Sequence, residues 1–159
     1  METESNLPQE SGVGAFNKYV GFIQQIELVG VWLRSARVTN STGGITFYRA
    51  EVSIEDSATW KDIEEGFQVF HKYTAVFTNG KKKLGRIEAE FVTDYMSDEP
   101  MDDECFDIFK TNNLPLNTWP YFREYVSNTT GRMQWLPFTL PTRKFLSTPT
   151  IANPSSEEE

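Results

Sequence analysis

The side chains best suited to catalysis are scarce in this chain, which contains one His and one Cys. A Cys/His nucleophile pair needs both groups together, and a thiolate or imidazole metal site needs several ligands. His71 lies in a run of alternating apolar and polar residues, which is typical of an ordinary strand residue. Cys105 lies among acids and beside Phe106, and those acids disfavour the thiolate. A small buried apolar residue is therefore the better interpretation of Cys105.

Carboxylates are the remaining candidates for chemistry, and they fall into two groups. The acids of residues 98–107 either hold a divalent ion or form a solvated loop and the start of a helix, and their spacing matches no Ca²⁺ loop template. Glu88, Glu90 and Asp94 share one parity, which places them on one strand face, as an enzyme site or a solvated sheet face would. No Gly-rich phosphate loop follows a strand. We predict that the protein is not an enzyme and binds no cofactor or metal.

The elements that must position these residues begin with two strands. Residues 22–37 are predicted to form a long strand whose buried face changes near a bulge at Gly30, with a helix as the alternative. A turn at residues 39–44 precedes a half-buried strand, residues 45–56, in which apolar and charged side chains alternate. Residues 58–62 are predicted to connect this strand to the next one.

The strongest local signal is a β-hairpin. Residues 67–77 and 87–95 both alternate between apolar and polar side chains, and Asn79-Gly80 lies between them. Two alternating runs around an Asn-Gly pair are typical of two antiparallel strands joined by a tight loop. These runs therefore supply the third and fourth strands of the predicted sheet.

Two helices are predicted in the C-terminal third. Acids precede the apolar residues of segment 102–113, and a Leu-Pro pair ends that helix. The second helix is expected to begin at Asn117 or Thr118, to hold Pro120 in its first turn and to end at Gly131. Strands first and helices afterwards predict an α+β fold, a four-stranded antiparallel sheet with the C-terminal helices packed on one side.

Composition excludes several classes of protein. The 159 residues suit one domain, and aromatics at 14% argue against a disordered chain. A net charge of -8 argues against a nucleic-acid partner, and no apolar run is long enough for membrane insertion. The acidic first residues do not resemble a secretory signal, so a cytoplasmic location is expected. We predict a flexible tail at residues 1–14, one domain at 15–146 and a disordered acidic tail at 147–159.

Segment 119–145 resembles the C-terminal half of SecB-type export chaperones. The family pattern runs approximately F-P-Y-x-R-E, then R-G-x-F-P-x-L-x-L-x-P-V-N-F after about six residues. This chain has Pro120-Tyr121, Arg123-Glu124, Gly131-Arg132 and Pro137-Phe138-Thr139-Leu140, and Ile23-Gln24-Gln25-Ile26 is similar to the first-strand pattern Q-I-x-R-I. The resemblance covers roughly residues 20–146 and includes the order of strands and helices.

The resemblance implies a cytoplasmic, non-enzymatic holdase that binds unfolded polypeptides or preproteins for export or folding control. It also implies a homotetramer, assembled as a dimer of dimers, with client grooves lined by aromatic and aliphatic side chains. Exposed apolar grooves combined with net charge suit such a function on physical grounds.

Departures from the family pattern bear on the choice of partner. Gly30 and Arg34 stand where the export family has acids that contact the SecA motor, which leaves Glu88 as the acid carried over for that contact. The segment Tyr121–Val126 looks closer to SecB-like chaperones that accompany toxin-antitoxin pairs. A dedicated chaperone of one client, such as an antitoxin, is therefore the alternative function, and a small enzyme using Glu88 and its neighbours is a third.

Large aromatic residues are the candidates for client binding. Either each contributes to a groove or helix-packing surface, or it belongs to the core, as large apolar residues usually do. Trp60 and Trp135 are favoured for a groove because they lie in predicted connecting segments. The complete set is Trp60, Phe106, Phe109, Trp119, Phe122, Trp135 and Phe145.

Overall fold

A single antiparallel sheet organises the protein. The computed structural model describes residues 10–43, 50–136 and 138–143. The elements in chain order are α1 (Glu10–Gln25), β1 (Glu27–Asn40), β2 (Glu51–Ile63), β3 (Gly66–Asn79), β4 (Lys82–Met96), α2 (Asp103–Asn112) and α3 (Leu114–Arg132). The strand order is β1-β4-β3-β2, and each neighbouring pair is antiparallel. The strands β1 and β2 are therefore the two edges of the sheet.

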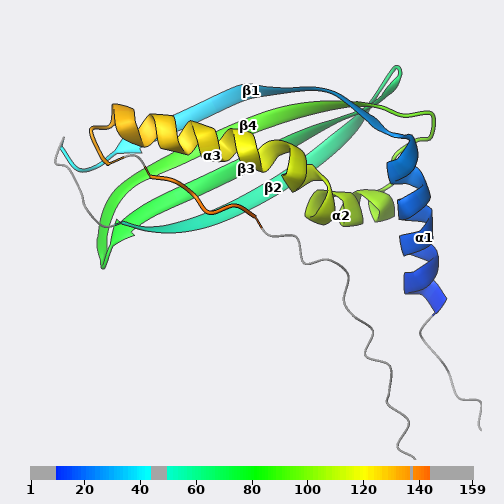
Figure 1. Ribbon diagram of the computed structural model, residues 1–159, viewed down its shortest axis with the longest axis horizontal. Helices are drawn as coiled ribbons and strands as arrows, with labels where there is room; N and C mark the ends of the chain where they lie inside the picture. The colour runs from blue at the N-terminus through cyan, green and yellow to red at the C-terminus, as the bar shows by residue number, and fades with distance from the viewer. Residues whose placement is uncertain (1–9, 44–49, 137, 144–159) are drawn as a thin grey trace, which may run out of the picture.

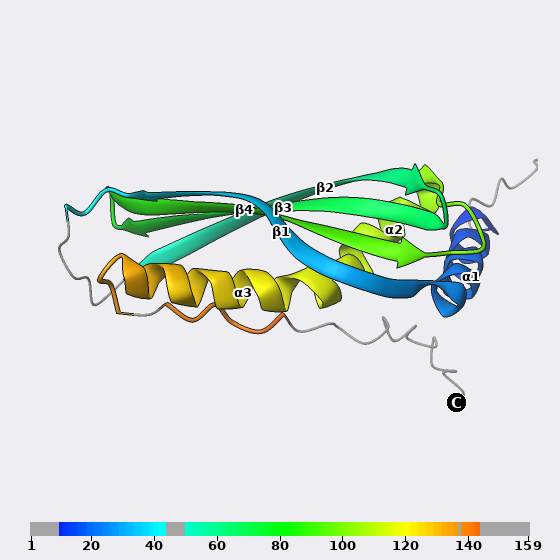
Figure 2. The same ribbon diagram turned by 90° about the horizontal axis from the view of Figure 1, so that it is seen from above.

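The helices cover one face and one end of this sheet. Figure 2 shows α3 lying along one face, and Figure 1 shows α1 beside one end of the strands. Phe109 of α2 and Phe122 of α3 are fully buried together with the side chains of β3 and β4 that face them. The predicted α+β architecture, a four-stranded antiparallel sheet with the C-terminal helices on one side, is confirmed.

The central strands β3 and β4 follow the predicted hairpin. Alternate residues of β3, from Phe67 to Phe77, are fully buried, and the residues between them are partly exposed. The turn at Asn79-Gly80 places Gly80 at a φ of 58°, in the left-handed region that Gly adopts without a steric penalty. The Asn-Gly signal and the strand alternation therefore both correspond to the observed hairpin.

The N-terminal part of the chain differs from the prediction. Residues 22–25, predicted as the start of a strand, belong to helix α1, and β1 begins only at Glu27. The helical alternative holds for this part because Tyr19, Phe22 and Ile23 recur at helical spacing on the buried side. The bulge predicted at Gly30 is present as a register shift between Leu28 and Gly30. Helix α1 also begins at Glu10, inside the segment expected to be a tail.

The second predicted strand continues further than expected. Strand β2 extends to Ile63, so residues 58–62, predicted as a connection, are strand residues paired with β3. Ala58 and Trp60 continue the alternation because both are half-buried on the helix side, while Thr59 and Lys61 are exposed. Residues 44–49, which include the predicted start of this strand, lie outside the described residues.

Both C-terminal helices form, with one difference at their junction. Asp102 caps α2, because its side chain accepts a hydrogen bond from the amide of Cys105 at 2.7 Å. Helix α3 begins at Leu114 rather than at residue 117 or 118, with Pro115 in its first turn. Pro120 therefore lies inside α3, where it removes one helical hydrogen-bond donor. Asn113 alone separates the two helices, which explains why the boundary signals of this region were ambiguous.

Candidate functional site

A short segment after α3, residues 138–143, turns back along that helix and is called the strap here (Figure 1). Three hydrogen bonds attach it to α3. Arg123 Nε donates to the carbonyl of Leu140 at 2.6 Å, Trp119 Nε1 donates to the carbonyl of Pro141 at 3.0 Å, and the amide of Phe138 donates to Thr130 Oγ1 at 2.8 Å. Leu140 is fully buried, so the strap is part of the core and not a loose tail.

The end of the strap is also attached to the edge strand β2. A guanidinium nitrogen of Arg143 lies 3.5 Å from a carboxylate oxygen of Asp56, and its charge lies over the ring of Trp119 at 4.9 Å. Cation–π contact and ion pairing act on the same side chain here. Arg143 thus links α3, the strap and β2 at one point.

A polar network continues from Asp56 into the core. Because a carboxylate only accepts hydrogen bonds, His71 Nε2 donates to Asp56 at 2.7 Å. On the other side of the ring, Nδ1 lies 2.8 Å from Thr118 Oγ1, which also contacts the hydroxyl of Tyr73 at 2.9 Å. The hydrogen bond from His71 and the charge of Arg143 hold the pKa of Asp56 below its ordinary value, and burial raises the pKa of Tyr73.

The order Asp56–His71–Thr118 resembles a carboxylate–imidazole–hydroxyl triad. Thr118 is fully buried, however, and its hydroxyl also donates to the carbonyl of Leu114 at 3.1 Å within its own helix. A nucleophile must reach a substrate atom, and this hydroxyl is not accessible to one. The network therefore connects β2, β3 and α3 structurally, and His71 is the strand residue that its position in the sequence predicted.

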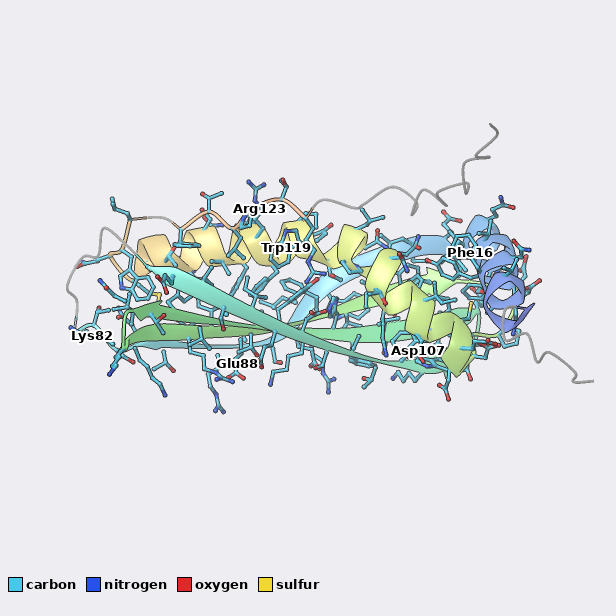
Figure 3. The ribbon with its side chains drawn as sticks, turned by 90° about the horizontal axis from the view of Figure 1, so that it is seen from below. Phe16, Lys82, Glu88, Asp107, Trp119 and Arg123 are labelled. Carbon is cyan, nitrogen blue, oxygen red and sulfur yellow. The ribbon has the colours of Figure 1, made fainter. Side chains whose placement is uncertain are left out.

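Two hollows lie along α3 and the strap, and they meet at Pro120 and Arg123. The first, of about 370 Å³, is lined by several polar residues, among them Glu124 and Asn128. The second, of about 200 Å³, is called the apolar hollow, and it is lined by Pro115, Leu116, Trp119, Pro120, Arg123, Thr142 and Arg143. Figure 3 shows Trp119 and Arg123 together on the helix side of the sheet.

The structure divides the aromatic candidates between two core clusters. Phe106 and Phe109 are buried in the cluster of α1 and α2, with Trp60 half-buried against Phe106 at a ring distance of 6.1 Å. Trp119 and Phe122 are buried in the cluster of α3. Their binding of clients stays a prediction. Phe145 lies outside the described residues.

Trp135 belongs to the α3 cluster, although it lies beyond the helix. Its ring meets that of Phe77 edge-on at 5.5 Å, and it is 6% exposed. Gly85 permits this packing, because a Cβ there would lie 2.9 Å from the Trp135 ring and 2.7 Å from the carbonyl of Thr39. Both Trp60 and Trp135 were predicted to lie in connecting segments. This location is correct for Trp135 and wrong for Trp60, which lies in β2.

Exposed apolar residues form a second feature that the candidate set omitted. They concentrate on β1, where side chains of both faces are exposed, and on α1. The signal in the sequence was the run of apolar residues of both parities from Leu28 to Leu33, which was interpreted only as a change of buried face. The residues concerned are Val13, Phe16 and Val20 of α1 and Leu28, Val29, Trp32, Leu33 and Val38 of β1.

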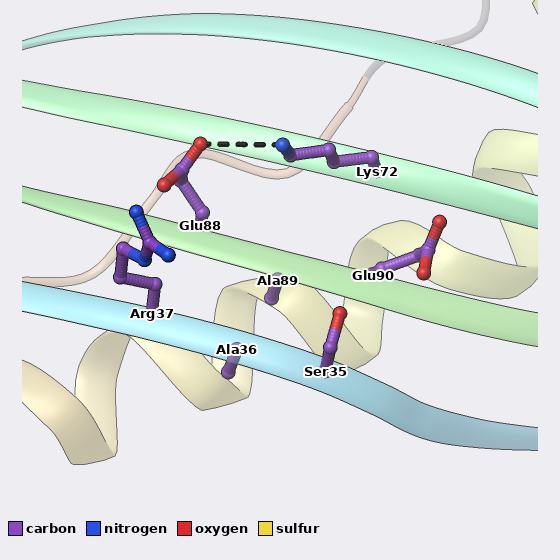
Figure 4. A pocket seen from close by; sticks show the side chains of 7 residues that line it. All are labelled: Ser35, Ala36, Arg37, Lys72, Glu88, Ala89 and Glu90. Carbon is purple, nitrogen blue, oxygen red and sulfur yellow. Dashed lines mark ion pairs between the residues drawn. The ribbon is translucent and has the colours of Figure 1, made fainter.

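The opposite face of the sheet is charged, and Glu88 lies there (Figure 3). Its carboxylate is 3.1 Å from Arg86 and 3.3 Å from Lys72, and these hydrogen bonds hold the pKa of Glu88 below its ordinary value. Figure 4 shows the shallow hollow that Glu88 shares with Arg37, Lys72 and Glu90. The one acid carried over for a motor contact therefore has two cations beside it.

Comparison with known proteins identifies the architecture. The sequence matches no protein-family model and no curated protein. The structure is similar to that of the SecB-like chaperone Rv1957 of Mycobacterium tuberculosis, solved in complex with a ChAD peptide from the HigA1 antitoxin. The TM-score is 0.72 at 15% sequence identity, and the match covers 82% of this chain and 99% of that one. The chain has the SecB-like fold.

Two further findings concern metal binding and membrane spanning. In the parts of the chain that the structure describes, His, Cys, Asp and Glu side chains form no cluster of three or more that could hold a metal ion. Within the same residues, each helix is too short or too polar to span a bilayer.

Proposed function

We propose that this protein is a holdase chaperone that binds unfolded polypeptides through exposed apolar surfaces. The observation that carries the proposal is strand β1, an edge of the SecB-like sheet whose large apolar side chains are exposed on both faces. Large exposed apolar patches on a soluble protein commonly mark the sites where it binds a partner. A holdase requires an exposed apolar surface because it binds unfolded chains.

Aggregation of a chemically denatured model protein on dilution tests this function. We expect the purified chain to suppress light scattering at a stoichiometric ratio, without nucleotide, because the bound client is held by apolar contact alone. Suppression that requires a large molar excess, as an inert crowding protein would, contradicts the proposal. The variant Glu55→Gln is a suitable control, because Glu55 is exposed on β2 and faces away from the helices.

Assembly is part of the same proposal. Within the described part of the chain, β1 and β2 are sheet edges without a further strand beside them. An edge with apolar side chains and few charges invites pairing with another chain. Strand β1 has 14 residues and carries only Glu27, Arg34 and Arg37 as charges. We propose that a second copy covers part of this edge in an even, symmetric oligomer, with a tetramer as the expected form. Light scattering that gives a monomer at micromolar concentration contradicts the proposed assembly.

A dedicated chaperone for one client is the second candidate. It is favoured by the complex of Rv1957 with an antitoxin peptide, because a similar fold there holds one defined segment. This candidate predicts tight binding of one antitoxin segment and weak binding of unrelated unfolded proteins. Titration of the chain with both kinds of ligand distinguishes the two functions, since a general holdase binds them with similar affinity.

Export and a cytoplasmic location are the remaining parts of the proposal. If the chain delivers preproteins to the SecA motor, we propose Glu88 as the contact residue on the outer face of the sheet. Arg86 and Lys72 already pair with Glu88, so a cationic partner must compete with both. Glu88→Gln should then weaken SecA binding, and unchanged SecA binding by this variant contradicts the assignment.

A further inference from the structure

The apolar hollow between α3 and the strap combines apolar walls with positive charge. Two guanidinium groups, those of Arg123 and Arg143, contribute to its lining, and none of the described residues adds a carboxylate to it. Asp56 neutralises Arg143 from the side of β2. The chain carries a net charge of -8, so a hollow with an excess of positive charge is a local exception.

Arg123 is the cation that gives this hollow its charge. Its Nε is fixed by the carbonyl of Leu140 at 2.6 Å, which orients the guanidinium at the rim and leaves its terminal nitrogens for another acceptor. Among residues 10–43, 50–136 and 138–143, no carboxylate lies within 4.0 Å of it, although Glu124 is its neighbour in sequence. Glu124 instead accepts a hydrogen bond from Asn128.

The walls of the hollow are suited to a large apolar side chain. Trp119, Pro115 and Pro120 present rigid apolar surface, and Leu116 is 50% exposed beside them. An apolar side chain of a client can contact Trp119, Pro115 and Pro120 in this hollow.

We propose that the apolar hollow binds client segments in which a large apolar side chain lies beside Asp or Glu. The apolar side chain contacts Trp119 and Pro115, and the carboxylate pairs with the terminal nitrogens of Arg123, a pairing that is strong when it is bidentate. The inference rests on the proposed chaperone function and specifies the chemistry of its clients. It predicts that this chain prefers acidic segments in spite of its own negative charge.

Two fluorescent peptides test the proposal by anisotropy at low salt. Each peptide is ten residues long and has one central Trp in a sequence of Gly and Ser. Two Asp flank this Trp in the first peptide, and two Asn flank it in the second. We expect the wild-type chain to bind the Asp peptide about tenfold more tightly, which corresponds to about 1.4 kcal/mol for a charge-assisted hydrogen bond. Equal affinity for the two peptides overturns the proposal.

Variants of the chain separate recognition from stability of the strap. Arg123→Gln should weaken the Asp peptide about tenfold and leave the Asn peptide unchanged. Equal weakening of both peptides overturns the proposal, because it means that the variant only loosens the strap through the lost bond to Leu140. Arg132→Gln removes the same charge from the same helix at an exposed position and should change neither affinity.

Two more outcomes distinguish this inference from the proposed function. If the wild-type chain binds neither peptide but still suppresses aggregation, the inference is overturned and the holdase function stands. If Arg123→Gln dissociates the oligomer in light scattering while wild type binds neither peptide, a second copy occupies the hollow and the inference is overturned as well. Retained assembly with selective loss of the Asp peptide supports it.

Discussion

The two edge strands of the sheet, β1 and β2, differ in how far their apolar side chains are covered. Among the described residues, each pairs with a strand on one side only, and each has helix-side apolar residues. On β2 those residues are half-buried, and Asp56 connects the strand to the strap through Arg143. On β1 the helix-side residues Leu33 and Val38 are 42% and 41% exposed.

The two edge strands also differ in their number of charged side chains. Strand β2 carries Glu51, Glu55, Asp56, Lys61 and Asp62, and charged side chains on an edge oppose pairing with another chain. Strand β1 has fewer charges and exposes Trp32 on the outer face. If the proposed assembly is correct, β2 belongs to the stable protomer and β1 is the edge that associates with another chain. Three substitutions test this difference, in order of their expected effect on the free energy of unfolding.

Trp60→Ala should have the largest effect. Trp60 is half-buried on β2 and packs against Phe106 of α2, so truncation removes contacts across the helix–sheet interface. We expect a loss of about 2 kcal/mol, below the range of 3–5 kcal/mol typical of fully buried aromatic residues. Urea unfolding at fixed protomer concentration measures it.

Trp32→Ala is the matched control on β1. Trp32 is 42% exposed, so the same truncation should cost less than about 1 kcal/mol in the protomer. A loss equal to that of Trp60→Ala would remove the contrast between the two edges. The measurement is made at a protomer concentration at which light scattering gives a monomer, because the proposed assembly would bury β1 against a second copy.

Asp56→Ala should have an intermediate effect, and that effect should depend on pH. The substitution leaves His71 without the acceptor of its Nε2 hydrogen bond and Arg143 without its ion pair. Asp56 is partly exposed, so we expect a loss of about 1–2 kcal/mol at pH 7. Glu55→Ala removes a charge from the adjacent, exposed position and should cost less than about 0.5 kcal/mol.

The pH dependence has a definite sign. The pKa of Asp56 is lower in the folded protein than its ordinary value of 3.8, because His71 donates a hydrogen bond to it and Arg143 adds positive charge. The resulting stabilisation is fully present above that ordinary value and is lost as the pH falls through the lower pKa of the folded state. The difference between wild type and Asp56→Ala should therefore narrow below about pH 4. A constant difference from pH 7 to pH 3 contradicts this assignment.

The fold was more predictable than the surfaces that differ between the edges. The β3–β4 hairpin could be predicted because burial on one face produces strict alternation and the Asn-Gly turn has its own signal. Helix α1 was predicted only in its last residues, Phe22–Gln25, and there only as the alternative to a strand, because these residues also fit the apolar run that continues into β1. Local pattern alone does not say where a helix ends when apolar residues continue on both parities.

The candidate site was less predictable because it depends on contacts between distant segments. Arg143 meets Asp56, and Arg123 meets Leu140, only after the chain turns back along α3. No periodicity within a window of the sequence encodes such contacts. The sequence also does not distinguish a Trp of the core from a Trp that lines a hollow. Trp119 is 7% exposed, and its ring is nevertheless part of the wall of the apolar hollow.

Leu33→Thr should have the smallest effect on stability and a clear effect on function. Thr has a high strand propensity, and Leu33 is 42% exposed, so the free energy of unfolding should change by less than about 0.5 kcal/mol. The substitution nevertheless removes apolar surface from the helix side of β1. If β1 is kept for association, the variant should suppress client aggregation less well or assemble less completely at the same concentration. Val52→Thr on β2 is the matched control. Val52 packs against the core, so its substitution should lower the free energy of unfolding more than Leu33→Thr does. If Leu33→Thr leaves both aggregation suppression and assembly unchanged, the exposed apolar face of β1 is not the associating surface.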